Sequence, residues 1–157
     1  MDGTTFLALA SLCAPLVHPS TAQALVTVES SFNPNAIGVV SGALERQPRD
    51  LSEAIGTATT LRANGWNFSI GLAQINVRTL DRLGLSINDG FDACRNLAAM
   101  QTVLAECRER VARNTSEQSA LRQTLSCYYS GNFTTGFRHG YVNRVVVAAQ
   151  AIARGPP

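Results

Sequence analysis

Apolar residues recur along most of the chain at spacings of three and four, which is the period of an amphipathic α-helix. A shorter stripe of this kind precedes Pro34, which ends it because the residue before a proline avoids helical geometry. Alternation typical of a strand is weak and local. The pattern therefore predicts a mainly α-helical fold with a small β-hairpin. The short stripe is Ala24, Leu25, Val28 and Phe32, and the clearest one, which follows Asp92, is Ala93, Leu97, Met100, Leu104, Cys107 and Val111.

Capping and turn residues locate the ends of the predicted helices. Asp50 followed by Glu53 forms an acidic capping box, and Gly65 suits the position just after the helix that this box opens. Thr115 and Gln118 form a second capping box. Residues 130–140 read as a loop. We expect helices over residues 5–13, 19–32, 51–64, 92–114, 116–128 and 141–153, another that ends near residue 80, a hairpin within residues 37–47 and a strand at residues 67–70.

Length and composition favour one globular domain over residues 1–157. The hydrophobic content of 45% and the charged content of 15% exclude a disordered chain. The 13 basic residues are all Arg and are scattered, and a net charge of +2 gives no indication of nucleic-acid binding. We therefore expect no nucleic-acid partner, although an anionic polymer could still serve as substrate.

The N-terminal stretch has some features of an export signal. FLALASLCAPLV is similar to a signal-peptide core, and residues 22–24 are similar to a cleavage site. However, no Lys or Arg precedes Arg46, and cleavage after Ala24 would divide a predicted helix. We expect Thr5 to Cys13 to form the first helix of the domain, so that any export signal lies upstream, is atypical or has been removed. No stretch is long enough to span a membrane, so a transmembrane protein is not expected.

The four cysteines, Cys13, Cys94, Cys107 and Cys127, form no CxxC pair, and the two histidines are far apart, so we expect neither a metal site nor a cofactor. Two disulfides and an oxidising compartment are one interpretation, and four buried thiols are the other. Cys94 and Cys107 in one helix would lie about 20 Å apart, at ~1.5 Å per residue, and cannot pair. The remaining pairings are Cys13–Cys94 with Cys107–Cys127, which we favour, or Cys13–Cys107 with Cys94–Cys127.

Glu29 is the first candidate for chemistry. It lies among apolar residues where a predicted helix meets a loop, and burial there can raise the pKa of a carboxyl toward neutrality. A solvated glutamate at a helix end is the alternative. Three blocks follow one another along the chain: Glu29-Ser30, then GLAQIN at residues 71–76, then CYYSGN at residues 127–132, closed by the helix start Tyr141-Val142.

The order and content of these blocks resemble the lytic transglycosylase (SLT) family, a branch of the lysozyme-like fold. The resemblance extends from about Cys13 to Ala153 and is greatest to small members associated with type IV secretion and conjugation machines. The chain departs from the family pattern in two blocks: Ala73 stands where Met is common, Cys127 replaces Ala and Tyr129 replaces Asn. These departures leave a role for position 129 open.

The resemblance implies an α+β lysozyme-like domain whose hairpin lines a substrate cleft, and cleavage of peptidoglycan to 1,6-anhydro ends. It implies Glu29 as the single catalytic residue, with Ser30, Gln74 and Tyr128 binding substrate and Tyr128 also tuning the pKa of Glu29. The alternatives are a Ser30 hydroxyl bonded to its own helix, a structural Gln74 and a Tyr128 that only packs in the core. The resemblance further implies a location in the periplasm, with glycan strands and secretion-system components as partners. A catalytically weak glycan-binding scaffold and a hydrolytic lysozyme are the competing functions.

Overall fold

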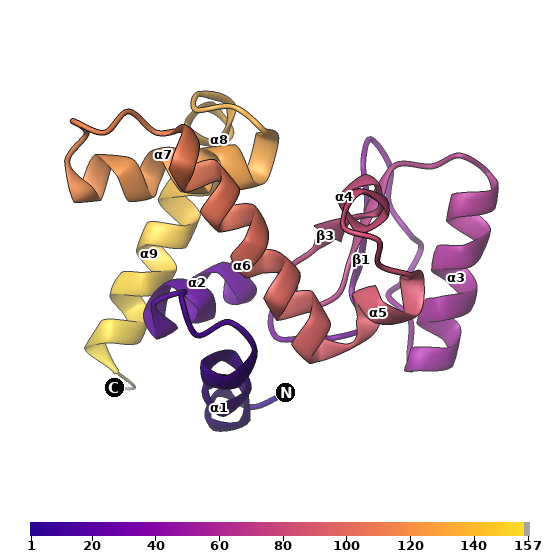
Figure 1. The fold of residues 1–157 in the computed structure, drawn as a ribbon. Coiled ribbons are helices and arrows are strands. Elements are labelled where there is room, and N and C mark those ends of the chain that lie inside the picture. The colour runs from indigo at the N-terminus through magenta and orange to yellow at the C-terminus, as the bar shows by residue number, and fades with distance from the viewer. Residues whose placement is uncertain (156–157) are drawn as a thin grey trace.

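The computed structural model describes residues 1–155 and is mainly helical with one small sheet (Figure 1). The mainly α, α+β fold class predicted from the sequence is confirmed. No helix within residues 1–155 has the length and apolar character needed to cross a membrane. The helices are α1 (Gly3–Cys13), α2 (Pro19–Ser30), α3 (Leu51–Ala63), α4 (Val77–Arg82), α5 (Ile87–Phe91), α6 (Ala93–Arg110), α7 (Glu117–Ser130), α8 (Thr135–Arg138) and α9 (Tyr141–Arg154); the strands are β1 (Ile37–Val39), β2 (Phe68–Ile70) and β3 (Ile75–Asn76).

Helix α6 forms the centre of the arrangement (Figure 1). It runs between the sheet with α3, α4 and α5 on one side and α2, α7, α8 and α9 on the other. Its apolar stripe is buried as predicted, with Leu97 and Met100 fully inaccessible to solvent. Because this stripe contacts both groups of elements, the core is continuous from α1 and α2 to the sheet.

The three strands form one antiparallel sheet in the order β1-β2-β3. Ile70 in the central strand is opposite Ile37 on one side and Ile75 on the other. The expected hairpin within residues 37–47 is wrong, because only β1 forms there and its partner is β2. Gln47 takes the place of a second strand: its side-chain amide accepts from Ile37 N at 2.8 Å and donates to Ile37 O at 2.9 Å.

Helix ends follow the polar side chains that can accept from free backbone N–H groups. Asp50 and Asp92 cap α3 and α6 as the sequence predicts. Thr115 was expected to cap α7, but Ser116 does so, accepting from Ser119 N at 3.3 Å. The expected loop at residues 130–140 contains the short helix α8, whose first N–H groups are satisfied by the Asn132 side chain.

Two disulfides connect the helices. Cys13–Cys94 joins α1 to α6, and Cys107–Cys127 joins α6 to α7. This is the pairing that we favoured from the sequence, and Cys94 and Cys107, which were not expected to pair, lie on the same helix. Both bridges therefore hold α6 to its neighbours, and the second one ends directly before Tyr128.

Candidate active site

Glu29 is the second-to-last residue of α2 and borders a cavity of about 310 Å³. The helix stops there because Ser31 and Phe32 adopt left-handed backbone angles, with φ of 50° and 62°. One wall of the cavity comes from the sheet region and the other from α6 and α7. The sheet side includes Val39, Val40, Ser69, Ile75 and Asn76, and the helical side includes Val103, Tyr128 and Tyr129.

Burial raises the pKa of Glu29 from 4.5 to about 7, because removal from water disfavours the charged carboxylate. Two groups oppose this shift. The Tyr141 hydroxyl donates a hydrogen bond of 2.6 Å to Glu29 Oε1, and the positive charge of Arg144 also favours the carboxylate. Near neutral pH, Glu29 therefore exchanges readily between its protonated and ionised forms, as general acid–base chemistry requires.

The tyrosine that contacts Glu29 is Tyr141 at the start of α9. Tyr128 was expected to bond near Glu29 and tune its pKa, but its hydroxyl donates to Ala73 O at 2.6 Å. Tyr128 borders the same cavity as Glu29, whereas the buried Tyr141 is the tyrosine that bonds the carboxyl, so an effect of Tyr128 on the pKa of Glu29 stays a prediction. The sequence offered one signal for Tyr141, its position as the first residue of a predicted helix.

Ser30 links the first block to the second. Its hydroxyl donates to Leu72 O at 2.7 Å, and a contact of 3.4 Å to Val26 O in its own helix is much weaker. The bond to Leu72 draws the end of α2 against the GLAQIN segment, across 42 positions in sequence. Ser30 thus fixes the place of its neighbour Glu29.

Gln74 lines the cavity and is folded against its own turn. Its Nε2 donates to Ala36 O and to Gly71 O, each at 3.1 Å. Its Oε1 lies so close to Gly38 that a Cβ there would approach within 2.6 Å, so a larger residue at position 38 would have to displace the Gln74 side chain. The observed contacts of Gln74 are structural, and a contact with substrate stays a prediction.

Asn96 on α6 is a residue that sequence reasoning missed. It is 1% exposed, and its side chain accepts from Ala73 N at 2.8 Å while donating to Ile70 O at 3.0 Å and Gly90 O at 2.8 Å. Gly71, at φ 81°, lies so near that a Cβ would collide with the Asn96 amide. The GLAQIN turn is therefore held from behind by one buried amide. A polar residue inside the apolar stripe of α6 was the available signal.

Glu29 is the one carboxylate among the cavity-lining residues of the described chain. The three acidic residues that follow it in sequence do not border the cavity: Glu45 lies outside it, Asp50 caps α3, and Glu53 forms an ion pair of 2.6 Å with Arg46. Trp66 is half-exposed and does not border the cavity. The structure thus brings Glu29, Gln74 and Tyr128 to one cavity, with Ser30 directly behind Glu29.

Comparison with known proteins gives consistent matches. Residues 7–145 match the family described as "Transglycosylase SLT domain". The chain is 49% identical over 156 residues to "Type IV secretion system protein virB1" of Brucella abortus, an alignment that covers 95% of the chain and 66% of that protein. "Protein virB1" of Rhizobium radiobacter is 33% identical, with 97% of the chain and 64% of that protein covered. For "Protein virB1" of Agrobacterium fabrum, identity is 32%, with coverage of 92% and 58%.

These relatives are longer than the part that matches. The chain spans 66% of the Brucella protein and 58% of the Agrobacterium fabrum protein. No solved structure matched the chain.

Proposed function

The chain belongs to the transglycosylase SLT domain family, and from this membership we infer that it is a peptidoglycan lytic transglycosylase. We propose that its single domain, residues 1–157, cleaves the β-1,4 bond between N-acetylmuramic acid and N-acetylglucosamine and leaves 1,6-anhydro ends. Glu29 is the catalytic residue in this proposal. The observation that carries it is a lone cavity carboxyl with a pKa near 7 and a tyrosine donor on one of its oxygens.

The first step uses Glu29 as an acid. Because Oε1 accepts from Tyr141, we assign proton transfer to Oε2. The proton moves from Oε2 to the glycosidic oxygen as the bond between that oxygen and C1 of the muramic sugar breaks. The acetamido oxygen of the same sugar stabilises the positive charge at C1, which is the part that a second carboxylate plays in most glycosidases.

The second step uses the same residue as a base. Glu29, now a carboxylate that Tyr141 and Arg144 stabilise, accepts the proton of the 6-hydroxyl while O6 bonds to C1. Glu29 returns to its protonated form, and no water is consumed. A mechanism in which one carboxyl group acts first as acid and then as base fits a cavity whose described lining contains one carboxylate.

Substrate binding is assigned to the cavity walls. Tyr128 and Gln74 border the space beside Glu29, and Ser30 lies at the end of the same helix. We propose that Gln74 and Tyr128 orient the acetamido sugar, while Ser30 contributes by placing Glu29. Ala73, at the position where Met is common in the family, contributes its backbone, whose N–H and C=O bond to Asn96 and Tyr128.

The cellular setting follows from the relatives and the cysteines. We propose that the protein acts in the periplasm and opens the wall locally for a type IV secretion or conjugation apparatus. The names of the relatives support the apparatus, and two disulfides fit an oxidising compartment. Cell fractionation with thiol alkylation tests the location. Recovery of reduced protein from the cytoplasm would contradict it.

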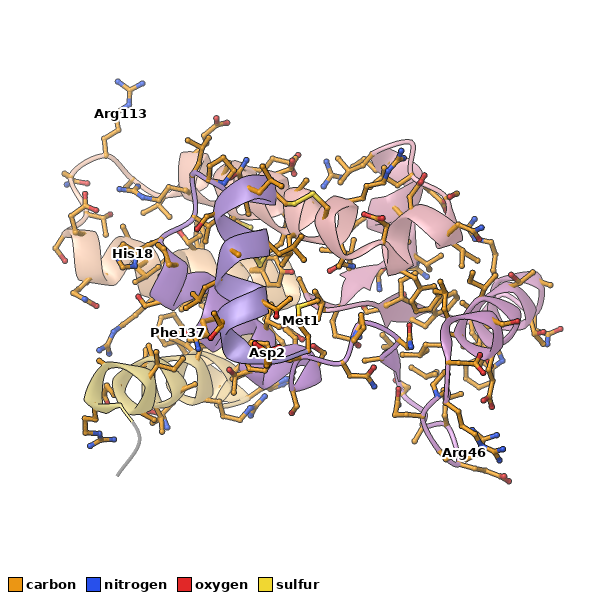
Figure 2. All side chains as sticks on the ribbon, turned by 90° about the horizontal axis from the view of Figure 1, so that it is seen from below. Met1, Asp2, His18, Arg46, Arg113 and Phe137 are labelled. Atoms are coloured by element: carbon orange, nitrogen blue, oxygen red, sulfur yellow. A yellow bond between two sulfur atoms is a disulfide. The ribbon has the colours of Figure 1, made fainter. Side chains whose placement is uncertain are left out.

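A peptidoglycan zymogram tests the assignment of Glu29. The wild type should clear the gel, and Glu29→Gln should lose at least about 100-fold in activity, since acid–base groups contribute on that scale. Glu53→Gln is the matched control, because its partner Arg46 lies at the far end of the molecule from the α7–α9 helices (Figure 2). Full activity of Glu29→Gln would remove Glu29 from the mechanism. A stable chain that binds glycan without clearing would indicate the scaffold function.

The mass of the products separates a transglycosylase from a hydrolytic lysozyme. Digested peptidoglycan should yield muropeptides with anhydro ends, lighter by one water than hydrolysis products. Exclusively hydrated ends would overturn the proposed intramolecular step and leave the acid role of Glu29 standing.

A further inference from the structure

Tyr129 occupies the position where the motif residue is Asn, and its surroundings give it a defined place. Its ring stacks on Tyr141, with centroids 4.6 Å apart and planes at 17°. Its hydroxyl lies 2.9 Å from His139 Nδ1, and the His139 ring meets it edge-on at 78°. One face and the hydroxyl of Tyr129 are therefore fixed by protein groups.

The rest of the Tyr129 ring is open. The side chain is 40% exposed and borders the same cavity as Glu29 and Tyr128. Since Tyr141 covers one face and His139 contacts the hydroxyl end, a ligand in the cavity would meet the ring on its other face. Tyr141 also donates to Glu29, so the stacked pair places an aromatic surface at a fixed distance from the catalytic carboxyl.

Such a surface is complementary to a sugar ring. The face of an aromatic ring is electron-rich, and weakly polarised C–H groups like those on the apolar side of a pyranose interact with it favourably. The stack on Tyr141 and the bond to His139 pre-organise the ring, which lowers the entropic cost of binding. On this geometry we propose that Tyr129 is a substrate-contacting residue that stacks on a sugar ring next to the scissile bond. The inference rests on the proposed function.

Glycan binding to catalytically inactive protein tests it. In the Glu29→Gln background, the dissociation constant for a hexamer of β-1,4-linked N-acetylglucosamine is measured by NMR titration. Tyr129→Leu should weaken binding about fivefold, the scale of one aromatic stacking contact. Tyr129→Phe keeps both ring faces and should stay within about twofold of the parent. Phe137→Leu is the control, because Phe137 is a similarly exposed aromatic on α8 that does not border the cavity (Figure 2).

Kinetics on peptidoglycan distinguish substrate contact from positioning of Tyr141. With Glu29 restored, Tyr129→Leu should raise KM about fivefold and leave kcat and the pH profile unchanged. An unchanged dissociation constant, or a loss confined to kcat with a displaced pH profile, would overturn the inference, as would equal losses in Tyr129→Leu and Tyr129→Phe. If the Glu29→Gln parent binds no hexamer while wild type clears peptidoglycan, the inference fails and the proposed function stands. If the parent binds no hexamer and the wild type does not clear peptidoglycan, the proposed function fails.

Discussion

Replacing Tyr141 with Phe isolates the hydrogen bond to Glu29. The hydroxyl donates to Oε1 over 2.6 Å and stabilises the carboxylate, so its removal should raise the pKa of Glu29 above about 7. A hydrogen bond to a charged group contributes about 1.5–3 kcal/mol, and part of it persists with the protonated acid. At about 1.4 kcal/mol per pKa unit, we expect an upward shift of roughly one unit.

In Tyr141→Phe, the alkaline limb of the pH–activity profile should therefore move to higher pH. At pH 8 about one tenth of Glu29 is protonated when its pKa is 7, and about half when it is 8. The pH at which activity falls to half its maximum should therefore rise by roughly one unit in Tyr141→Phe. An NMR titration of the Glu29 carboxyl carbon measures the same shift without turnover.

Tyr128→Phe provides the control for this prediction. Its hydroxyl bonds to Ala73 O rather than to Glu29, so the same change of side chain should leave the pKa of Glu29 within a few tenths of a unit. A pKa in Tyr141→Phe that is unchanged or lower would refute the reasoning. Equal shifts in both variants would mean that general desolvation, rather than one hydrogen bond, sets the value.

Three further predictions concern stability. The pKa of Glu29 in the folded chain lies above its usual 4.5, so the folded state loses stability as pH rises from about 4.5 to 7. Glu29→Gln does not titrate, so its free energy of unfolding relative to wild type should be about 2–3 kcal/mol higher at pH 8 than at pH 4, as measured by urea unfolding. Asn96→Leu removes three hydrogen bonds to buried backbone groups and should lose about 2–4 kcal/mol, whereas the exposed Asn88→Leu should change by less than about 1 kcal/mol. Replacing Cys13 and Cys94 by Ser should cost about 1 kcal/mol more than replacing Cys107 and Cys127, because the bridges close loops with separations of 81 and 20 residues; the reverse order in thermal unfolding would contradict this entropic account.

Much of the site could be predicted from the sequence because its parts lie in short blocks. Glu29 was found from an apolar helix that ends before Pro34, and the structure places it there with a raised pKa. The GLAQIN and CYYSGN blocks were expected to complete a cleft, and residues of both border the Glu29 cavity. Helix geometry alone excluded a bridge between Cys94 and Cys107 and left two possible disulfide pairings.

Contacts between distant segments escaped sequence reasoning. Asn96 meets the turn at Ala73 over 23 positions, and a polar residue within an apolar stripe does not by itself identify the backbone groups that its amide will bond. The hairpin expected at residues 37–47 failed for a similar reason, since β1 pairs with β2 and the Gln47 side chain fills the local edge. Partners in a sheet are chosen by packing, which propensity does not encode.

The sequence by itself determined the approximate extents of the longer helices, which face of α6 is buried and that Glu29 stands at a helix end among apolar residues. These features depend on neighbours within about one helical turn. Only the tertiary structure decided the pKa and the hydrogen-bond partner of the Glu29 carboxyl. Packing of α9 against α2 brings Tyr141 to it across 112 positions, while burial of its carboxyl raises its pKa to about 7. Desolvation and long-range hydrogen bonds arise only when the helices pack, so the chemistry of this carboxyl is a property of the fold.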